Sequence, residues 1–589
     1  MDKKTNALGE TSVISDAHKD SDSNLSCGIL KDGTRFFYPE TMSVVQSLTS
    51  FKTWNSFGTL VWLASVVAIG STWLLYLMGA LPVWYFCVQF AFWRIVYNLG
   101  IGYILHKQSN SSFFVRIYHS AMRRYPFLRS LLEESVVFTK GKYKVSEFPD
   151  VFNAWMLFRQ LENVVLSSDL ISYIVLSMVC WEKISPWCPL DMLCFFIGLG
   201  SILFSLRCKI EAHRVVGDFA WYWGDFFFLL DRKLVFEGIF QMFPHPMYTV
   251  GYTFMYGIPL MAKSYTLFYM SVFGHLSQLA FLALVENPHI DRTYSQIVEI
   301  SEEDKQRDAI LYGEGYLKPK EMITLLNFNI FRASDLLLAL VIFYLFLCIF
   351  LPIPPYAFVI HALFWRVFHN GFLGYLLREE SEKRWFSKQY ESQKIAFRNW
   401  KRIYNASVTI TSIAYCLCAY KLFQWEMPLF SSGESRVFII VVGILLIGIN
   451  VYVSLNVFEA IGSFGYFYGD FFIREVSPRI NYSGIYRYLN NPDTILGISA
   501  YYGVAFISGS WVVFLLAIFS HVCVIAFDHF VELPHMKKHY EDQLRKRGGF
   551  HAELLRKVDT TKTECKKCVQ SLQVKLASSK EICDDMVKG

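Results

Sequence analysis

Twelve apolar stretches, arranged as six closely spaced pairs, are the feature that most limits how this chain can fold. A helix that crosses a membrane needs about 20 apolar residues, with a minimum of about 17. The stretches therefore predict an all-α polytopic membrane protein with about 10–12 transmembrane helices, since the shortest stretches are borderline in length. The pairs are residues 57–79 with 81–105, 163–181 with 190–207, 246–262 with 265–286, 331–353 with 356–377, 406–423 with 436–455, and 492–509 with 510–531.

The composition supports this class and excludes others. Charged residues make up 18% of the 589 residues, whereas about 25% are charged in an ordinary soluble protein. The net charge of +6 does not point to a nucleic-acid partner. Most of the 13 cysteines lie in apolar stretches, which does not indicate a disulfide framework. Cys565 and Cys568 form a CxxC pair without two further ligands at suitable spacing, so no metal site is predicted.

The positions of Lys and Arg predict the orientation of the chain in the membrane. Of 56 basic residues, the short connections within the pairs contain only Lys183, Lys263, Lys421 and Arg436. Nearly all the others lie in the two tails and in the long connections between pairs. Cytosolic loops of membrane proteins are enriched in Lys and Arg, so both tails and every long loop are predicted to be cytosolic.

The first and second halves of the chain share a set of residues at nearly constant spacing, which indicates an internal duplication. Each copy contains an even number of apolar stretches, so the copies are expected to be tandem repeats that point the same way across the membrane. The matched residues are Phe92-Trp93-Arg94, Asn98, Gly102 and Tyr103 with Phe364-Trp365-Arg366, Asn370, Gly374 and Tyr375; Gly217, Gly224-Asp225-Phe226-Phe227 and Gly238 with Gly462, Gly469-Asp470-Phe471-Phe472 and Gly484; Pro246, Gly251 and Gly257 with Pro492, Gly497 and Gly503; and His275, Val285-Glu286, Pro288-His289 and Tyr294 with His521, Val531-Glu532, Pro534-His535 and Tyr540.

These observations predict five segments. Residues 1–50 are polar and are expected to be a disordered cytosolic tail. Residues 51–295 form the first repeat, and residues 331–542 form the second. A cytosolic linker at 296–330 joins them, and a basic cytosolic tail follows at 543–589. The first repeat is expected to have the longer internal loop, at about 106–150, because the spacing between matched residues falls from 272 to about 245 after the first block.

The matched glycines allow two interpretations. Gly462, Gly465 and Gly469 in the second copy, with Gly217 and Gly224 in the first, would let the backbone approach a ligand, since glycine lacks a Cβ. Close helix–helix packing through small residues is the alternative, and it is common in membranes. The first copy has Ala220 at the third glycine position.

The matched acids and histidines are candidates for chemistry at the cytosolic face. Glu286 and Glu532 each end an apolar stretch, where a carboxylate can accept hydrogen bonds from a ligand; the alternative is a solvated acid. The proline two residues later is expected to end the helix and so to fix the direction of the Glu. His289 and His535 are candidate bases, and a histidine with satisfied hydrogen bonds is the alternative. His275 and His521 are interpreted as hydrogen-bonding residues between helices.

Basic residues just before the third pair of each copy are candidates for binding a lipid phosphate, because Arg can contact phosphate oxygens with two hydrogen bonds. General attraction of basic loops for anionic lipid is the equally weighted alternative. The residues are Arg232, Lys233, Arg479 and Arg487.

Taken together, these residues resemble the phospholipid N-methyltransferases, within the group of membrane methyltransferases related to isoprenylcysteine carboxyl methyltransferase. Single-copy members carry Gly-x-x-Gly before a Gly-Asp-aromatic-Phe run, then Asn-Pro-Met-Tyr, and then a Glu followed by Pro. Residues 462–472 keep the first pattern, His245-Pro246-Met247-Tyr248 is similar to the second, and Glu286-Asn287-Pro288 and Glu532-Leu533-Pro534 are similar to the third. The two-copy form resembles the fungal phosphatidylethanolamine N-methyltransferases over about residues 50–545.

The resemblance implies methyl transfer from S-adenosyl-L-methionine to the amine of phosphatidylethanolamine, in the endoplasmic reticulum membrane. It implies that Glu286, His289, Tyr248 and His245 are catalytic, with the Glu and His as candidate bases. Tyr248, Tyr252 and Trp223 are candidates to hold the sulfonium by cation–π contact. The residues expected to bind the cofactor are Gly217, Gly224, Asp225, Gly462, Gly465, Gly469, Asp470, Glu286 and Glu532.

Three departures from the family pattern stand out. The second position of a Glu-Glu pair is Asn287 or Leu533, and the second copy has Asp493-Thr494 where the first has Met247-Tyr248. The large fungal members usually continue with a soluble region after this point. This sequence ends at Gly589 after a basic tail, so that region is not expected to be central to the reaction. The first copy is favoured as the methyl-transfer site, because a Tyr beside the sulfonium is harder to replace than a glycine.

Two other functions remain open on the sequence. One is methylation of a prenylated cysteine carboxylate, against which the two-copy form argues. The other is lipid transport without catalysis, which predicts charges deep in the membrane. The apolar stretches are taken to be nearly uncharged apart from Arg94 and Arg366, which are expected to support each copy.

Overall fold

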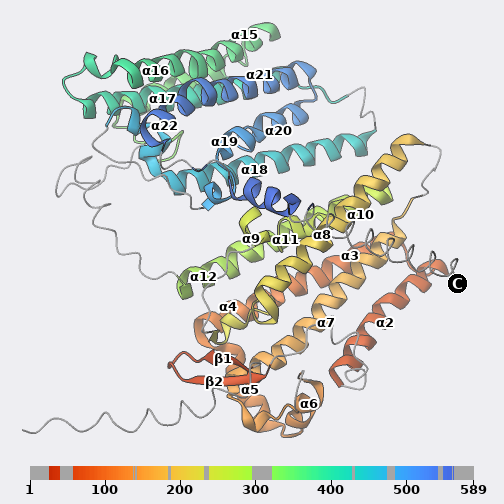
Figure 1. The fold of residues 1–589 in the computed structure, drawn as a ribbon. Helices are drawn as coiled ribbons and strands as arrows, with labels where there is room; N and C mark the ends of the chain where they lie inside the picture. The colour runs from red at the N-terminus through yellow and green to blue at the C-terminus, as the bar shows by residue number, and fades with distance from the viewer. Residues whose placement is uncertain are drawn as a thin grey trace, which may run out of the picture. The chain divides into compact units, whose positions relative to one another are not determined.

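The computed structural model describes residues 25–39, 57–136, 138, 142–182, 188–230, 238–294, 322–426, 432–473, 484–541, 545, 548–559 and 562. The chain divides into two compact units, residues 1–240 with 245–297 and residues 241–244 with 298–589. Figure 1 shows that each unit consists mainly of long helices packed side by side. Arg232, Lys233 and Arg479, three of the four predicted phosphate-binding residues, lie outside the described residues.

The first unit contains both long helices and short helical turns. Four π-helical or 3₁₀ turns interrupt or follow its helices: η1 (Val96–Ile101), η3 (Gly224–Phe226), η4 (Val250–Tyr252) and η5 (Leu282–Glu286). A further 3₁₀ turn is η2 (Val145–Glu147). The helices are α2 (Phe57–Leu77), α3 (Val83–Ile95), α4 (Gly102–Ser111), α5 (Phe113–Arg124), α6 (Phe127–Ser135), α7 (Asp150–Val179), α8 (Pro189–Trp221), α10 (Phe254–Ala262), α11 (Tyr265–Phe281) and α12 (Asn287–Tyr294), and the short α9 (Ile239–Met242) spans the division between the units.

The second unit follows a similar order, but it has only the short turn η7 where the first unit has α5, α6 and η2. Its turns are η6 (Val367–Phe372), η7 (Ser387–Gln389), η8 (Gly469–Phe471), η9 (Gly484–Arg487) and η10 (Asp528–Glu532). Its helices are α14 (Ala333–Leu347), α15 (Pro355–Arg366), α16 (Leu373–Lys383), α17 (Gln393–Lys421), α18 (Gly433–Tyr466), α19 (Pro492–Ile495), α20 (Ser499–Ser508), α21 (Trp511–Phe527) and α22 (Leu533–Tyr540).

All twelve apolar stretches are helical, which confirms a mostly helical membrane protein built from two copies. Six helices in the described part of the chain are long and apolar enough to cross a membrane. Others are shorter than expected: α10 has nine residues, about 14 Å at 1.5 Å per residue, whereas a bilayer core is about 30 Å thick. The turn η4 breaks the helix before α10 at Val250–Tyr252, so the predicted 10–12 full spans are not all present as single helices.

Matched glycines hold two helix pairs close together, one pair in each unit. A Cβ added to Gly198 would lie 2.5 Å from the carbonyl oxygen of Gly257, and one added to Gly443 would lie 2.6 Å from that of Gly503. These contacts pack α8 on α10 and α18 on α20. For Gly257 and Gly503 the packing interpretation is therefore correct.

A small antiparallel sheet corrects the prediction of a disordered tail at residues 25–39, the part of residues 1–50 that the structure describes. Strands β1 (Leu25–Ile29), β2 (Arg35–Pro39) and β3 (Leu229–Leu230) are ordered β2-β1-β3, with Cys27 opposite Phe37. Phe36 and Tyr38 of β2 pack on the ring of Phe152. The aromatic residues of this otherwise polar segment bury apolar surface on α7, which offsets the cost of ordering it.

A buried ion pair corrects the expectation that the apolar stretches are uncharged apart from two arginines. The Arg94 guanidinium lies 2.6 Å from the Asp169 carboxylate, and both side chains are only 4% exposed. The matched Arg366 has no acid at this position, since Asp169 corresponds to Ala414. Arg366 instead donates to Asn370 over 3.0 Å and lies 4.4 Å from the Tyr501 ring centroid. Each arginine thus supports its own unit by a different interaction.

Candidate functional site

The C-terminal parts of α8 and α18 share a sharp break at a glycine. Gly217 has φ 66° and ψ −179°, and Gly462 has φ 63° and ψ −175°. Only glycine adopts this region of backbone space readily. A Cβ added to either residue would meet no heavy atom within 4 Å. These two glycines are therefore required by backbone conformation and border open space, and helix packing does not explain them.

A buried indole closes the end of each broken helix. Trp155 Nε1 donates to the Tyr222 carbonyl over 3.1 Å, and Trp400 Nε1 donates to the Phe467 carbonyl over 3.0 Å. Free carbonyl groups at a helix end need such donors when they are buried. The sequence analysis missed these tryptophans, although Phe-x-x-Trp recurs at residues 152–155 and 397–400 with the same spacing of 245.

The Gly-Asp-Phe run after each break forms a tight turn. Trp223 and Tyr468, which precede the run, both have positive φ, at 49° and 57°. A Cβ on Gly224 or Gly469 would lie 2.4 or 2.3 Å from the ring of Phe219 or Phe464. These two glycines are required by packing within the turn. The turn directs Asp225, or Asp470, toward the end of the last helix of its own unit.

The last long helix of each unit changes to a π-helical turn that ends on the matched Glu, Glu286 or Glu532. Turns η5 (Leu282–Glu286) and η10 (Asp528–Glu532) lie at matched positions, and both end on Glu. π-Helical turns inside α-helices often mark functional sites. The expectation that Pro288 and Pro534 end the helix is wrong, because α12 and α22 continue through them. The widened turn accommodates the missing proline N–H, so the π-turn sets the direction of the Glu.

Each unit holds the histidine that follows its Glu-x-Pro motif in the same four-residue arrangement, which we call the histidine clamp. In the first unit, Ser109 Oγ lies 2.8 Å from His289 Nδ1, and Asp225 Oδ2 lies 3.7 Å from His289 Nε2. The His289 ring stacks on Phe226 with centroids 3.7 Å apart. Both ring nitrogens therefore face protein partners, and His289 is only 5% exposed.

The second unit reproduces the clamp with nearly the same distances. Ser381 Oγ lies 2.7 Å from His535 Nδ1, and Asp470 Oδ2 lies 3.3 Å from His535 Nε2. The Phe471 ring stacks on His535 at 3.6 Å between centroids, and His535 is 2% exposed. Sequence analysis missed the two serines, although their spacing of 272 equals that of the first matched block.

Glu286 of the first unit receives hydrogen bonds from two aromatic side chains. Tyr248 Oη donates to Glu286 Oε2 over 2.8 Å, and Trp223 Nε1 donates to the same oxygen over 3.3 Å. The Asp225 carboxylate lies close enough to repel the Glu286 charge. Four predicted site residues, Tyr248, Glu286, Asp225 and Trp223, therefore meet at one place, with His289 beside Asp225.

Glu532 has a different environment from Glu286. Thr494 replaces Tyr248, Tyr468 replaces Trp223, and within the described part of the chain no residue donates a hydrogen bond to the Glu532 carboxylate. Asp470, Asp493 and Asp528 act on it electrostatically instead. The second unit therefore has an acidic cluster where the first unit has an aromatic hydrogen-bonded carboxylate.

Two further predicted residues lie at the edges of these arrangements. His245 has φ 43°, and its carbonyl accepts from the backbone N–H of Tyr248 over 2.8 Å, which begins the turn that carries Tyr248. Burial lowers the pKa of the His245 imidazole, which favours the neutral form at physiological pH. Arg487 ends η9, and its carbonyl accepts from Arg545 over 3.0 Å.

The interpretation of His275 and His521 as hydrogen-bonding residues between helices agrees with the structure. His275 Nε2 lies 2.9 Å from the Tyr248 carbonyl oxygen, and Nδ1 lies 2.7 Å from Tyr256 Oη. The matched His521 contacts the Thr494 carbonyl at 3.0 Å and Tyr502 Oη at 2.9 Å. Each histidine thus joins the last long helix of its unit to the interrupted helical segment that precedes that helix.

Comparison with known proteins shows that both site regions are similar to one family. Residues 193–297 and 438–543 each match the family model of the phospholipid methyltransferases. These segments include both glycine breaks, both Gly-Asp-Phe turns and both π-turns. Each repeat therefore contains one segment that is similar to the phospholipid methyltransferases.

Over most of its length, the chain is similar to fungal phosphatidylethanolamine N-methyltransferases. It is 35% identical to that of Paracoccidioides brasiliensis strain Pb03 over 594 residues, which covers 93% of this chain and 60% of the relative. It is 33% identical to that of Chaetomium globosum over 570 residues, which covers 91% of this chain and 60% of the relative. The chain thus spans about 60% of the length of these relatives. No solved structure matches the chain.

Proposed function

We propose that this protein transfers a methyl group from S-adenosyl-L-methionine to the headgroup amine of phosphatidylethanolamine, the first step toward phosphatidylcholine. The observation that carries the proposal is the convergence of Tyr248, Trp223 and Asp225 on Glu286 within a phospholipid methyltransferase domain. The names of the similar fungal proteins support the same reaction.

The residues around each glycine break leave room for a cofactor to lie close to the backbone. The space beside Gly217 and Gly462 is open, and a side chain there would extend into it. Gly224, Asp225 and Glu286 would complete the cofactor site in the first unit, and Gly465, Gly469, Asp470 and Glu532 the corresponding region of the second. S-Adenosyl-L-methionine supplies an activated methyl group when it is bound there.

The first unit is the proposed site of the reaction. Tyr248 and Trp223 hold the Glu286 carboxylate, and their rings provide π-faces for a positively charged group. The headgroup ammonium must lose a proton before its nitrogen can attack a methyl group. Glu286 can accept this proton, and the neutral His245 imidazole can act as a second acceptor. His289 orients Asp225 through the histidine clamp. We therefore assign His289 a positioning role in addition to its candidate role as a base.

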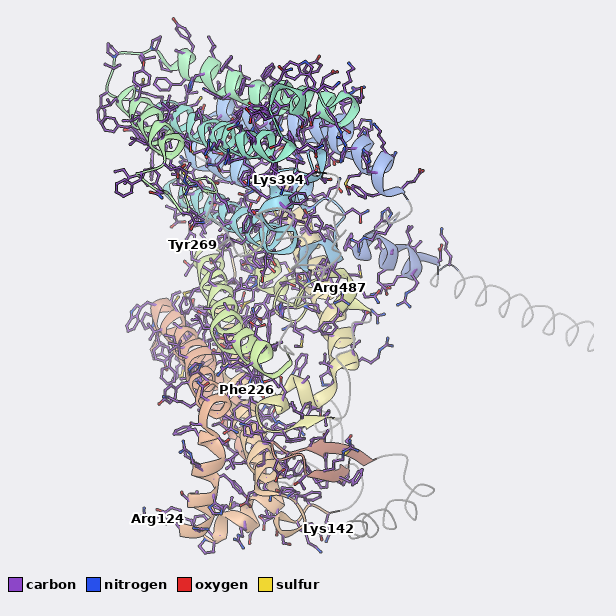
Figure 2. All side chains as sticks on the ribbon, turned by 90° about the vertical axis from the view of Figure 1, so that its left-hand side faces the viewer. Arg124, Lys142, Phe226, Tyr269, Lys394 and Arg487 are labelled. Atoms are coloured by element: carbon purple, nitrogen blue, oxygen red, sulfur yellow. The ribbon has the colours of Figure 1, made fainter. Side chains whose placement is uncertain are left out.

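We further propose that the protein resides in the endoplasmic reticulum membrane with both termini in the cytosol. The bias in Lys and Arg supports this orientation. Figure 2 shows Arg124 and Lys142 at one end of the first unit and Tyr269 toward the other, with Phe226 between them. Protease protection in sealed microsomes tests the orientation: tags at both ends and near residues 120, 305 and 390 should all be cleaved. A protected tag at any of these places would contradict it.

The activity is tested with the purified chain in liposomes that contain phosphatidylethanolamine. Labelled S-adenosyl-L-methionine should give labelled phosphatidylmonomethylethanolamine, and none should form without the lipid. Label on a prenylcysteine methyl ester instead would favour the carboxyl methyltransferase alternative. Absence of any labelled product with a folded chain would contradict both enzyme functions.

A further inference from the structure

The second unit contains a cavity of about 550 Å³ that none of the roles above uses. It lies between the start of α14 and the first half of α17, and it reaches Phe467 in the segment that follows the Gly462 break. Four basic residues line it, and Asp335 is its one acidic lining residue. The basic residues are Arg332, Arg398, Lys401 and Arg402.

Three of the four cations come from one face of α17. Arg398, Lys401 and Arg402 are separated by three residues and one residue, and Asn405 follows three residues later on the same face. Arg398 and Arg402 are exposed, and in the described part of the chain neither forms an ion pair. Two guanidinium groups on adjacent turns can together surround a phosphate.

The acid of the cavity is already engaged by its own loop. Asp335 is 2% exposed and accepts from Arg332 Nε at 3.3 Å and from the backbone N–H of Asn329 at 3.2 Å. Asn405 likewise holds the chain in place, because its Nδ2 donates to the Thr324 carbonyl over 3.2 Å. Asp335 therefore does not pair with Arg398 or Arg402 in the described part of the chain, and the basic lining residues outnumber the acidic one.

Among the described residues of the first unit, side chains fill the matched positions. With the spacing of 245 fixed by Trp155 and Trp400, the three cations correspond to Asn153, Met156 and Leu157. Asn153 is fully buried and is held by the Tyr143 hydroxyl at 2.6 Å, and Met156 is 3% exposed. Residues of the longer loop in the first copy, among them Leu132 and Tyr143, pack into this cluster. The second repeat lacks that loop, so its corresponding space is open and basic.

We propose that this cavity binds the phosphate group of an anionic phospholipid at a site built by the second unit alone. The start of α14 and the basic end of α17 both adjoin loops predicted to lie at the cytosolic membrane surface, where lipid phosphates are found. The cavity accommodates a headgroup, and its cations favour an exposed phosphate over a zwitterion. Because it extends to Phe467, a bound lipid would support the segment between the Gly462 break and the Asp470 turn.

The test uses the full chain in neutral mixed micelles with fluorescent phosphatidic acid as the probe. The wild type should bind it saturably and at least about tenfold more tightly than fluorescent phosphatidylcholine. Arg398→Ala/Arg402→Ala should weaken phosphatidic acid binding about tenfold or more. Lys388→Ala/Lys394→Ala removes two exposed charges close in sequence to Arg398 that do not line the cavity, and should stay within about twofold of wild type.

Three outcomes would overturn the proposal. Equal losses in the two double variants would show general attraction by basic loops, and saturation by phosphatidylcholine at the same concentration would exclude a preference for anionic lipid. Competition by inorganic phosphate or glycerol 3-phosphate as effective as the lipid would assign the site to a soluble ligand. Methyl transfer is measured in parallel, so loss of lipid binding with retained turnover separates this inference from the proposed function. Thermal unfolding of both variants should match wild type, because all four residues are exposed.

Discussion

The two repeats keep one arrangement and differ in another that lies only a helical turn away. Both hold the clamp histidine, His289 or His535, between a serine, an aspartate and a stacked phenylalanine, with distances to the serine that differ by 0.1 Å. Glu286 and Glu532, three residues earlier, have unlike surroundings. The histidine clamp is therefore a feature of the fold, whereas the environment of the Glu is where the repeats have diverged in chemistry.

The different surroundings of Glu286 and Glu532 indicate which repeat is better suited to hold the cofactor and substrate. A carboxylate held by Tyr248 and Trp223 has a fixed position and π-faces beside it. A carboxylate among three other acids, as at Glu532, is held by no described donor. The first repeat is thus suited to positioning a cationic ligand, while the second has a basic cavity on α17 at positions that buried side chains fill in the described part of the first.

The largest difference between the repeats is expected for the two Glu variants. Glu286→Ala should reduce cofactor affinity and turnover by about ten- to over a hundredfold, the equivalent of about 1.5–3 kcal/mol for a charge-assisted contact. Glu532→Ala serves as the matched variant and should have a much smaller effect. Cofactor binding by isothermal titration and turnover are measured separately at equal membrane expression.

Two results would change this assignment. Loss of cofactor binding in Glu532→Ala with normal binding in Glu286→Ala would move the reaction to the second repeat. If each variant lost about half the activity and kept its affinity, the repeats would act independently.

Substitution of the glycine at the helix break should destabilise the protein to a similar extent in both repeats. Gly217→Ala and Gly462→Ala force a non-glycine residue into a backbone region that costs about 1–3 kcal/mol, so each should lower the unfolding temperature of the solubilised protein. Gly200→Ala and Gly448→Ala are matched controls, because both glycines lie within helices with no heavy atom near an added Cβ. They should be neutral or slightly stabilising. An equal response in all four variants would refute the conformational explanation.

Tyr248→Phe sharpens the comparison at a single hydroxyl group. The variant keeps the ring but removes the 2.8 Å hydrogen bond to Glu286, which should cost about 1.5 kcal/mol, or about tenfold in turnover. Trp223 still donates to the same oxygen, so the loss should be smaller than for Glu286→Ala. Thr494→Val, at the matched position, should leave turnover within about twofold. A larger effect of Thr494→Val than of Tyr248→Phe would place the chemistry in the second repeat.

The smallest effect is expected at the clamp serines, where the repeats are alike. Ser109→Ala and Ser381→Ala each remove one hydrogen bond to a buried histidine and should destabilise the protein by about 1 kcal/mol. Denaturant unfolding of the solubilised protein measures both. Ser277→Ala is a control, since its exposed hydroxyl contacts only the carbonyl of its own helix. Clearly unequal losses at Ser109 and Ser381 would show that the clamp is not a common structural element.

Much of the architecture could be predicted because it depends on local pattern. Apolar stretches of helical length and the basic loops between them specify a helical membrane protein directly. Matched residues such as Gly217 with Gly462 and Asp225 with Asp470 indicated the duplication, and the structure places both pairs at equivalent turns. The site residues could be named for the same reason, although their roles stay predictions.

Other features could not be predicted, because they depend on contacts between distant segments. The strand hairpin at residues 25–39 lies in a mostly polar tail, and Phe36 and Tyr38 stabilise it by packing on Phe152 of α7. The pairing of Arg94 with Asp169 joins different helices, so neither residue alone indicated it. The π-turns before Pro288 and Pro534 also contradict the local rule that proline ends a helix.

The sequence by itself determined the class of this protein: a helical membrane chain, duplicated, with glycine, aspartate, glutamate and histidine at matched positions in each copy. These properties follow from hydrophobic length, charge distribution and repetition, which are all local or additive along the chain. Only the tertiary structure decided that His289 is enclosed by Ser109 and Phe226, and that Glu286 is held by Tyr248 and Trp223. The tertiary structure also opened a basic cavity beside α17 where the first repeat is filled. Burial and hydrogen-bond partners depend on which segments meet in space, and no single stretch of sequence contains that information.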